Sequence, residues 1–201
     1  MSAEAGPSAA ARTFVGLPLG AELGETVAAR VAAVLPRAEW RLARPAGLHA
    51  TLAFLGPVAR ERLPGLGAGL AAALAGQRAP ALRLGAGGVF PGLARPRVLW
   101  VGAEERGPAG DFERCRRAVV GALLAGGIDL GDELARPFRP HVTVARPRGA
   151  RTHVPEAFRA LALGLDWQPA AVVLYESVPA PGGSRYEPLG TWPLAGADGI
   201  P

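Results

Sequence analysis

The sequence contains no lysine, so all 22 of its basic residues are arginines. The formal net charge is +5 at pH 7, and the sequence pI is about 10.8. A basic balance of this kind permits an anionic partner such as nucleic acid. A gene rich in G and C would produce the same bias, because alanine, glycine and proline are abundant too. Charge alone therefore does not identify a partner.

Cysteine is also scarce, since Cys115 is the only one among 201 residues. A single thiol excludes a disulfide framework and a cysteine-based zinc site. Because Cys115 lies in the helical stretch DFERCRRAVV, we expect it to be a packing residue. Carboxylates do not cluster beside the histidines, which argues against a two-metal site. We expect no metal and no cofactor.

Long apolar runs are missing as well. No segment approaches the ~18 apolar residues that a membrane-spanning helix needs. The first residues, MSAEAGPSAAAR, include an early glutamate and no apolar stretch, so they do not resemble a secretory signal. Apolar residues nevertheless make up 49% of the chain, which is enough for a folded core. We expect a cytoplasmic protein without a membrane partner.

The order of predicted elements indicates an α+β fold with antiparallel strands. Helical spacing predicts helices over 21–36, 58–76, 109–127 and 154–164. Predicted strands span 12–19, 48–56, 79–90, 97–103, 141–146, 170–178 and 184–194. We interpret the order as a weak internal duplication of about 90 residues. The interpretation is one domain over 12–194, with a flexible tail at 1–11 and another at 195–201.

The segment GLHATLAFLG contains the first of two His-x-Thr triplets. Alternate residues of a strand point to the same face. His49 and Thr51 therefore share one face, and Ala50, Leu52 and Phe54 are expected on the other. The strand would bury its apolar face and present an imidazole and a hydroxyl on the opposite one.

The segment RPFRPHVTVARPR contains the second triplet. His141 and Thr143 share one face of this strand, while Val142 and Val144 face away. If the two halves pack symmetrically, both polar faces meet in one groove. The remaining histidine, His153, has no such partner, and we expect it at the surface before a helix.

Two imidazoles and two hydroxyls in one groove suit the cleavage of a phosphodiester. A neutral imidazole takes a proton from the attacking oxygen, and an imidazolium gives one to the leaving oxygen. Threonine hydroxyls donate hydrogen bonds to the non-bridging oxygens as charge builds up there.

With its two His-x-Thr motifs, the chain resembles the 2H phosphoesterases, and within them the RNA 2′,3′-cyclic phosphodiesterases, historically called 2′-5′ RNA ligases. The resemblance covers about 12–194. Besides HATL and HVTV it rests on TFVGLPL, FLG, GVFPGLARPRVLWVGA, RPFRPHVTVAR and VVLYESVPAPGGSRYEPL. It implies a two-lobed α+β fold with pseudo-twofold antiparallel sheets, outer helices and a central cleft. It also implies metal-independent hydrolysis of an RNA 2′,3′-cyclic phosphate to a 2′-phosphate.

The resemblance assigns roles by position. His49 matches the proton donor to the leaving 3′ oxygen, and His141 matches the base that activates water. Thr51 and Thr143 match the phosphate-contacting hydroxyls. Arg146 matches a phosphate-clamping arginine in the pattern HxTxxR. Strict alternation puts Arg146 on the Val142 side, so this role requires a bulge, an early strand end or a curled side chain. From the residues alone, the two histidine roles stay interchangeable.

Aromatic residues in matching stretches are candidates for stacking on a base. They are Phe14, Phe54, Phe90 and Tyr186, of which Tyr186 is the one expected at the cleft rim. The implied partners are RNA ends with a cyclic phosphate, tRNA fragments among them, and we expect a monomer.

Two alternatives stay open at this point. One is a protein that binds RNA ends without turnover, a function for which two proton-transfer groups are unnecessary. The other is a 2H hydrolase that acts on a small cyclic nucleotide.

Overall fold

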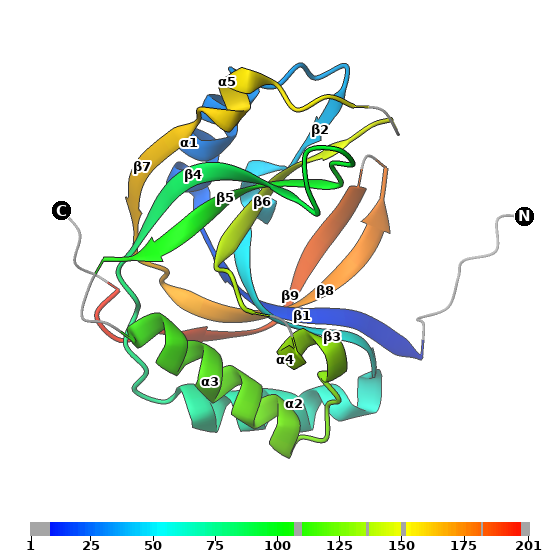
Figure 1. Ribbon diagram of the computed structural model, residues 1–201. Helices are drawn as coiled ribbons and strands as arrows, with labels where there is room; N and C mark the ends of the chain where they lie inside the picture. The colour runs from blue at the N-terminus through cyan, green and yellow to red at the C-terminus, as the bar shows by residue number, and fades with distance from the viewer. Residues whose placement is uncertain (1–8, 107–109, 136, 150–151, 182, 198–201) are drawn as a thin grey trace, which may run out of the picture.

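A computed structural model describes residues 9–106, 110–135, 137–149, 152–181 and 183–197 (Figure 1). The strands are β1 (Ala10–Pro18), β2 (Trp40–Leu42), β3 (His49–Ala59), β4 (Leu82–Phe90), β5 (Val98–Glu105), β6 (His141–Pro147), β7 (Ala162–Trp167), β8 (Ala171–Ala180) and β9 (Gly183–Pro193). The helices are α1 (Ala21–Ala32), α2 (Leu63–Leu74), α3 (Asp111–Ala125), α4 (Gly131–Ala135) and α5 (Glu156–Arg159), with short 3-10 turns η1 (Pro45–Gly47) and η2 (Arg60–Arg62). The α+β class with antiparallel pairing is confirmed.

One antiparallel sheet contains the nine strands of the described residues, in the order β7-β4-β5-β6-β3-β1-β8-β9, with β2 paired to β6. The order is symmetric about the boundary between β6 and β3. We call β1, β3, β8 and β9 the first lobe, and β4, β5, β6 and β7 the second lobe. In Figure 1 the strands of the two lobes meet near the centre of the molecule. Each lobe therefore contains strands from both halves of the chain. The hairpin β4–β5 of the first half belongs to the second lobe, and the hairpin β8–β9 of the second half belongs to the first lobe.

The helices lie at the two ends of the molecule, α1 and α5 at one end and α2, α3 and α4 at the other (Figure 1). Val27 and Val31 form the buried stripe of α1, at the i and i+4 spacing of one helix face. Cys115, Val119 and Leu123 form the corresponding stripe of α3. Burial raises the pKa of the Cys115 thiol to about 11, so the thiol is protonated and packs as expected.

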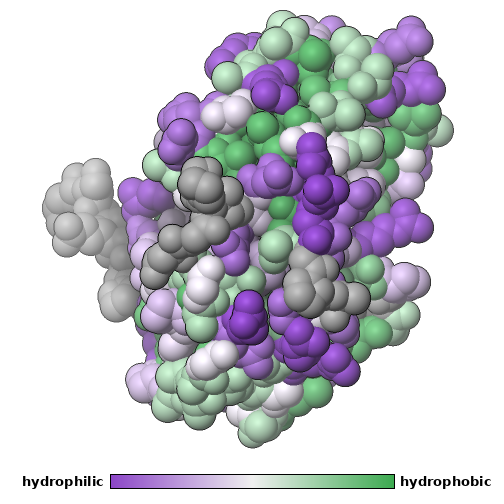
Figure 2. Space-filling model, turned by 90° about the vertical axis from the view of Figure 1, so that its left-hand side faces the viewer, coloured by the Kyte–Doolittle hydropathy of each residue, from purple (hydrophilic) through white to green (hydrophobic). Residues whose placement is uncertain are grey.

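None of the helices in the described part of the chain has both the length and the apolarity to cross a bilayer. Figure 2 shows the face at the left of Figure 1, where hydrophilic and hydrophobic residues are interspersed.

Several predicted elements were wrong. The expected helix over 154–164 is reduced to the single turn of α5, and β7 follows it. This strand forms because it pairs with β4, where Leu84 lies opposite Leu165 and Leu82 opposite Trp167. Helix α1 ends at Ala32 rather than at 36, and β3 runs past Gly56 to Ala59. The elements β2 and α4 were missed altogether.

Both expected tails are shorter than the sequence suggested, as far as their residues are described. Ala10 and Ala11 belong to β1, and Ala11 is fully buried. Ala195 bridges to Arg78 and exchanges backbone hydrogen bonds with Gln77 and Ala79. Both ends of the domain are therefore tied into the sheet.

Trp100 on β5 lies over a glycine on the neighbouring strand. Gly88 is its direct partner on β4, and a Cβ on Gly88 would come within 2.2 Å of the indole. The same indole lies 5.8 Å, centroid to centroid, from the ring of His141. Gly88 thus leaves room for the Trp100 indole next to that histidine.

We predict that Gly88→Ala lowers the free energy of unfolding by about 1–3 kcal/mol, because the indole must move. The matched control is Gly65→Ala, in the exposed first turns of α2, where a Cβ would meet nothing within 4 Å. The control should raise the free energy of unfolding by up to about 1 kcal/mol. Urea unfolding checks both, and equal effects of the two substitutions would contradict the packing argument.

Candidate active site

The two histidine strands meet at one backbone pair, Ala50 on β3 and Val142 on β6. Both side chains are completely buried, so this face of the two strands is the core. Adjacent residues point to the opposite face. His49 and Thr51 on β3, and the equivalent His141 and Thr143 on β6, therefore all lie on the face away from the core.

The antiparallel pairing fixes how these four side chains are arranged. Positions on either side of a paired residue lie opposite each other, which puts His49 next to Thr143 and Thr51 next to His141. The two histidines are then diagonal neighbours, with Cβ atoms about 7–8 Å apart. The charge of His141 indeed lowers the pKa of His49, as expected for neighbouring rings.

Both imidazoles are held in the same way. Nδ1 of His49 donates to the carbonyl oxygen of Gly47 at 2.7 Å, and Nδ1 of His141 donates to that of Arg139 at 2.7 Å. A carbonyl oxygen only accepts, so the hydrogen is on Nδ1 in each neutral ring. The identical i−2 contact leaves Nε2 as the reactive nitrogen in both histidines.

A bulge follows the threonine in each strand. Gly16 pairs with Thr51 but Val15 pairs with Ala53, so Leu52 is the extra residue of β3. Leu52 and Ala53 are both buried, which shifts the alternation by one residue. Phe54, expected on the core face, therefore lies on the histidine face with 55% of its surface exposed. The sequence prediction for Phe54 was wrong for this reason.

A corresponding bulge in β6 explains how Arg146 reaches the histidine face although strict alternation places it on the Val142 side. Trp100 pairs with Thr143 but Leu99 pairs with Ala145, and Val144 is the extra residue. After the bulge, Arg146 lies on the histidine face and is exposed. Of the three arrangements that the sequence left open, the bulge is the one observed.

Aromatic rings surround both histidines. Phe14 stacks on His49 with ring centroids 4.7 Å apart, and Tyr186 meets it edge-on at 5.0 Å. Tyr186 is half-buried and also covers Gly47, so it lies beside His49, and its role at a cleft rim stays a prediction. In the second lobe, Phe90 meets His141 edge-on at 5.2 Å.

Burial of the His49 ring lowers its pKa to about 4. The hydrogen bond to Gly47 opposes this shift, and the charge of His141 adds to it. In the free protein at pH 7, His49 is therefore neutral, with a lone pair on Nε2.

A pocket of about 400 Å³ lies at the end of β4 and the start of β5. Its lining consists of Phe90, Pro91, Arg95, Arg97 and Val98, on β4, β5 and the loop between them. Phe90 is shared between the pocket and the ring of His141. The volume falls within the range of small-molecule sites.

One neighbour of the site has no signal in the sequence. Arg41 on β2 lies directly opposite Arg146 on β6. Residues directly opposite in an antiparallel pair share a face, so Arg41 also lies on the histidine face. Only the pairing of the short strand β2 with β6, which the sequence did not predict, would have revealed it.

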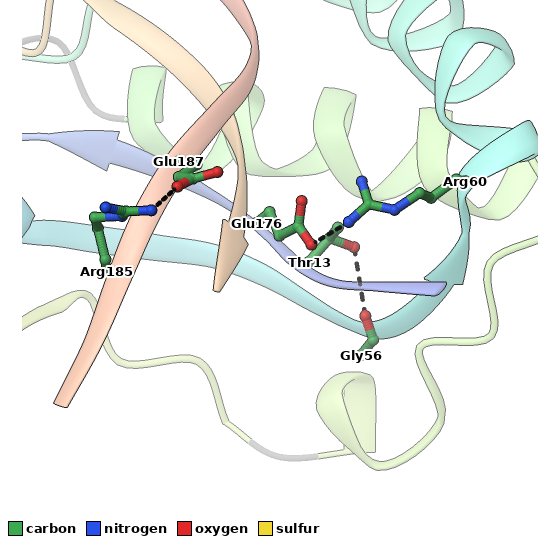
Figure 3. A network of polar contacts seen from close by, with 6 residues as sticks. All are labelled: Thr13, Gly56, Arg60, Glu176, Arg185 and Glu187. Atoms are coloured by element: carbon green, nitrogen blue, oxygen red, sulfur yellow. Dashed lines mark hydrogen bonds and ion pairs between the residues drawn. The ribbon is translucent and has the colours of Figure 1, made fainter. Parts of the chain in front are cut away.

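The opposite face of the first lobe carries a separate polar network (Figure 3). Arg60 donates to Glu176 at 2.7 Å, and Arg185 is paired with Glu187. Glu176 lies opposite Thr13 in the sheet, whereas its neighbour Tyr175 lies opposite Phe14 on the histidine face. These carboxylates therefore point away from the histidines. Within the described residues, no cluster of three or more histidine, cysteine or acidic side chains is arranged to hold a metal ion.

The fold and the site together define a two-lobed protein whose lobes present equivalent His-x-Thr strands at the centre of one curved sheet. The chain matches the model of the 2′-5′ RNA ligase superfamily over residues 23–178, and it belongs to this family. The predicted family and the expected two-lobed fold are thereby confirmed.

Individual relatives extend the match over most of the chain. It is 33% identical over 199 residues to the RNA 2′,3′-cyclic phosphodiesterase of Thermus thermophilus, covering 94% of this chain and 92% of that one. It is 32% identical over 193 residues to the enzyme of the same name from Geobacillus stearothermophilus, covering 92% of this chain but only 57% of that protein. The crystal structure of Escherichia coli LigT complexed with 3′-AMP superposes with a TM-score of 0.70 at 28% identity, covering 92% and 99% of the two chains.

We predict that His49 titrates in NMR experiments with a pKa of about 4 and that Tyr186→Ala moves this pKa toward 6.5. The reason is that burial is the largest cause of the shift, and removal of the tyrosine ring admits water. Tyr186→Phe keeps the ring and serves as the matched control, with no change expected. A wild-type His49 that titrates near 6.5 would contradict the described packing.

Proposed function

We propose that this protein hydrolyses the 2′,3′-cyclic phosphate at an RNA end and leaves a 2′-phosphate. The observation that carries the proposal is the diagonal placement of His49 and His141 about the Ala50–Val142 pair. Relatives over most of the chain are named RNA 2′,3′-cyclic phosphodiesterases, and E. coli LigT has been crystallised with a nucleoside 3′-phosphate. These names support the choice of a cyclic RNA phosphate over other phosphodiesters.

The reaction needs a proton acceptor on one side of the phosphorus and a donor on the other. Nε2 of one histidine takes a proton from water, whose oxygen attacks phosphorus. The bond from phosphorus to the 3′ oxygen breaks, and Nε2 of the other histidine delivers a proton to that oxygen. The products are a 3′-hydroxyl and a 2′-phosphate. Thr51 and Thr143 flank the histidines and donate hydrogen bonds to the non-bridging oxygens as charge accumulates.

The resemblance assigns proton donation to His49, and this role depends on the bound phosphate. With a pKa of about 4, His49 is mostly uncharged at neutral pH in the free protein. An anion beside the ring favours the imidazolium form and raises the pKa. Binding of the anionic substrate thus favours the positive charge on His49 that burial among aromatic rings disfavours. A proton then resides on Nε2 of His49 when the leaving oxygen needs it, and His141 acts as the base.

Arg146 is proposed to bind a phosphate of the RNA, since the bulge brings its side chain to the histidine face. Phe54 and Tyr186 on the same face are the proposed surfaces for a nucleobase. Independence from metal, a cytoplasmic location, a monomeric state and tRNA fragments as substrates stay predictions.

We predict that His49→Ala and His141→Ala each lower kcat by about 10²–10⁴-fold, because each removes one proton transfer. The assay uses an RNA ending in a 2′,3′-cyclic phosphate, with EDTA present, and the position of the product phosphate is mapped. His153→Ala is the matched control, since His153 is exposed and lies before α5, outside the groove. The control should retain wild-type turnover.

Full turnover by either histidine variant would refute paired acid–base catalysis. Loss of all turnover in EDTA, restored by a divalent cation, would refute the metal-independent reaction. Tight binding of the cyclic RNA end without any product would favour an RNA-end-binding protein instead.

A further inference from the structure

Arg41 and Arg146 form a pair of like charges that the sheet alone does not explain. They lie directly opposite each other on β2 and β6, on the face that carries the histidines. Like charges in this relation destabilise a sheet. We call these two residues the arginine pair.

Neither member of the pair has an acidic partner among the described residues. Some arginines elsewhere do, such as Arg83, which contacts Asp166. The nearby Arg44 donates to the carbonyl oxygen of Pro181 at 3.2 Å. The guanidiniums of the arginine pair are therefore available to an anion from outside the chain.

The position of the pair relative to the catalytic groups follows from the bulge in β6. Arg146 is the next residue after Thr143 that points to the histidine face, because Val144 and Ala145 are both buried. At ~3.3 Å per residue, its Cα lies roughly 10 Å along the strand from that of Thr143. The pair thus lies at one end of the groove, beyond the place where the reacting phosphate would be.

The hairpin strands β8 and β9 come close to Arg41. Nε of Arg41 lies 3.9 Å from the place that a Cβ on Gly183 would occupy. Tyr186, on the same hairpin, packs on His49. The arginine pair therefore belongs to the same groove as the histidines but contacts a different part of a bound chain.

We propose that the arginine pair binds the phosphate on the 5′ side of the nucleoside that carries the cyclic phosphate. The inference rests on the proposed function, and it adds a specificity determinant to it. Two guanidinium forks suit a phosphate diester or monoester, because both present several acceptor oxygens. The site distinguishes a nucleotide within RNA from a free nucleoside cyclic phosphate, which has no phosphate on its 5′ oxygen.

The test compares two substrates that differ only in this group: adenosine 2′,3′-cyclic phosphate and its 5′-phosphorylated form. The wild-type protein should show a higher kcat/KM for the 5′-phosphorylated substrate. Arg41→Gln should reduce the ratio of the two kcat/KM values by roughly 5- to 20-fold, because a charge-assisted contact to the extra phosphate is lost. Arg117→Gln, on the exposed side of α3, is the matched control and should leave the ratio unchanged.

An Arg41→Gln ratio equal to that of the wild type would overturn the proposal. An equal fall of kcat/KM for both substrates in a folded variant would also overturn it, because Arg41 would then act on the cyclic phosphate. Thermal unfolding monitors folding, and if the glutamine variant is unfolded, Arg41→Lys replaces it with a smaller loss of the ratio expected. A failure of the proposed function would be recognised separately, because the wild-type protein would then hydrolyse neither substrate.

Discussion

The backbone pairing of Ala50 with Val142 is the constraint on which the rest of the site depends. It joins the two lobes at the centre of one sheet, and it is the pairing observed between β3 and β6. Because both side chains are fully buried, the register resists a one-residue slip, which would turn the histidines into the core. Two apolar side chains thus decide where two imidazoles lie, although neither takes part in the chemistry. The bulge after each threonine then adds Phe54 and Arg146 to the same face.

The environment of the two rings differs even though their backbone contacts match. Phe14, Tyr175 and Tyr186 surround His49, and its pKa falls as a result. An imidazole buried in this way costs stability when it must be charged, so the folded state loses stability as the pH falls from the ordinary histidine value toward 4. In the proposed mechanism, a bound phosphate offsets that cost by its negative charge, so that the protonation of His49 depends on binding.

The features predictable from sequence were those that follow from strand alternation. The sharing of a face by His49 and Thr51, and by His141 and Thr143, requires only the period of two. Phe54 was misplaced because the bulge is set by pairing with β1, a neighbour that local sequence does not reveal. Arg41 was missed because β2 has three residues and forms only by pairing with β6. For β7, Leu163, Leu165 and Trp167 alternate in the sequence, but the predicted helix over 154–164 includes only the first of them, and the other two fell in no predicted element.

The central claim is that both imidazoles face a single bound phosphate group. NMR titration of the protein with inorganic phosphate tests it directly, with the Nε2 resonances of His49 and His141 followed separately. The account predicts that both resonances shift with the same dissociation constant and that phosphate raises the pKa of His49 above about 4. A shift confined to one ring, or two different dissociation constants, would contradict it.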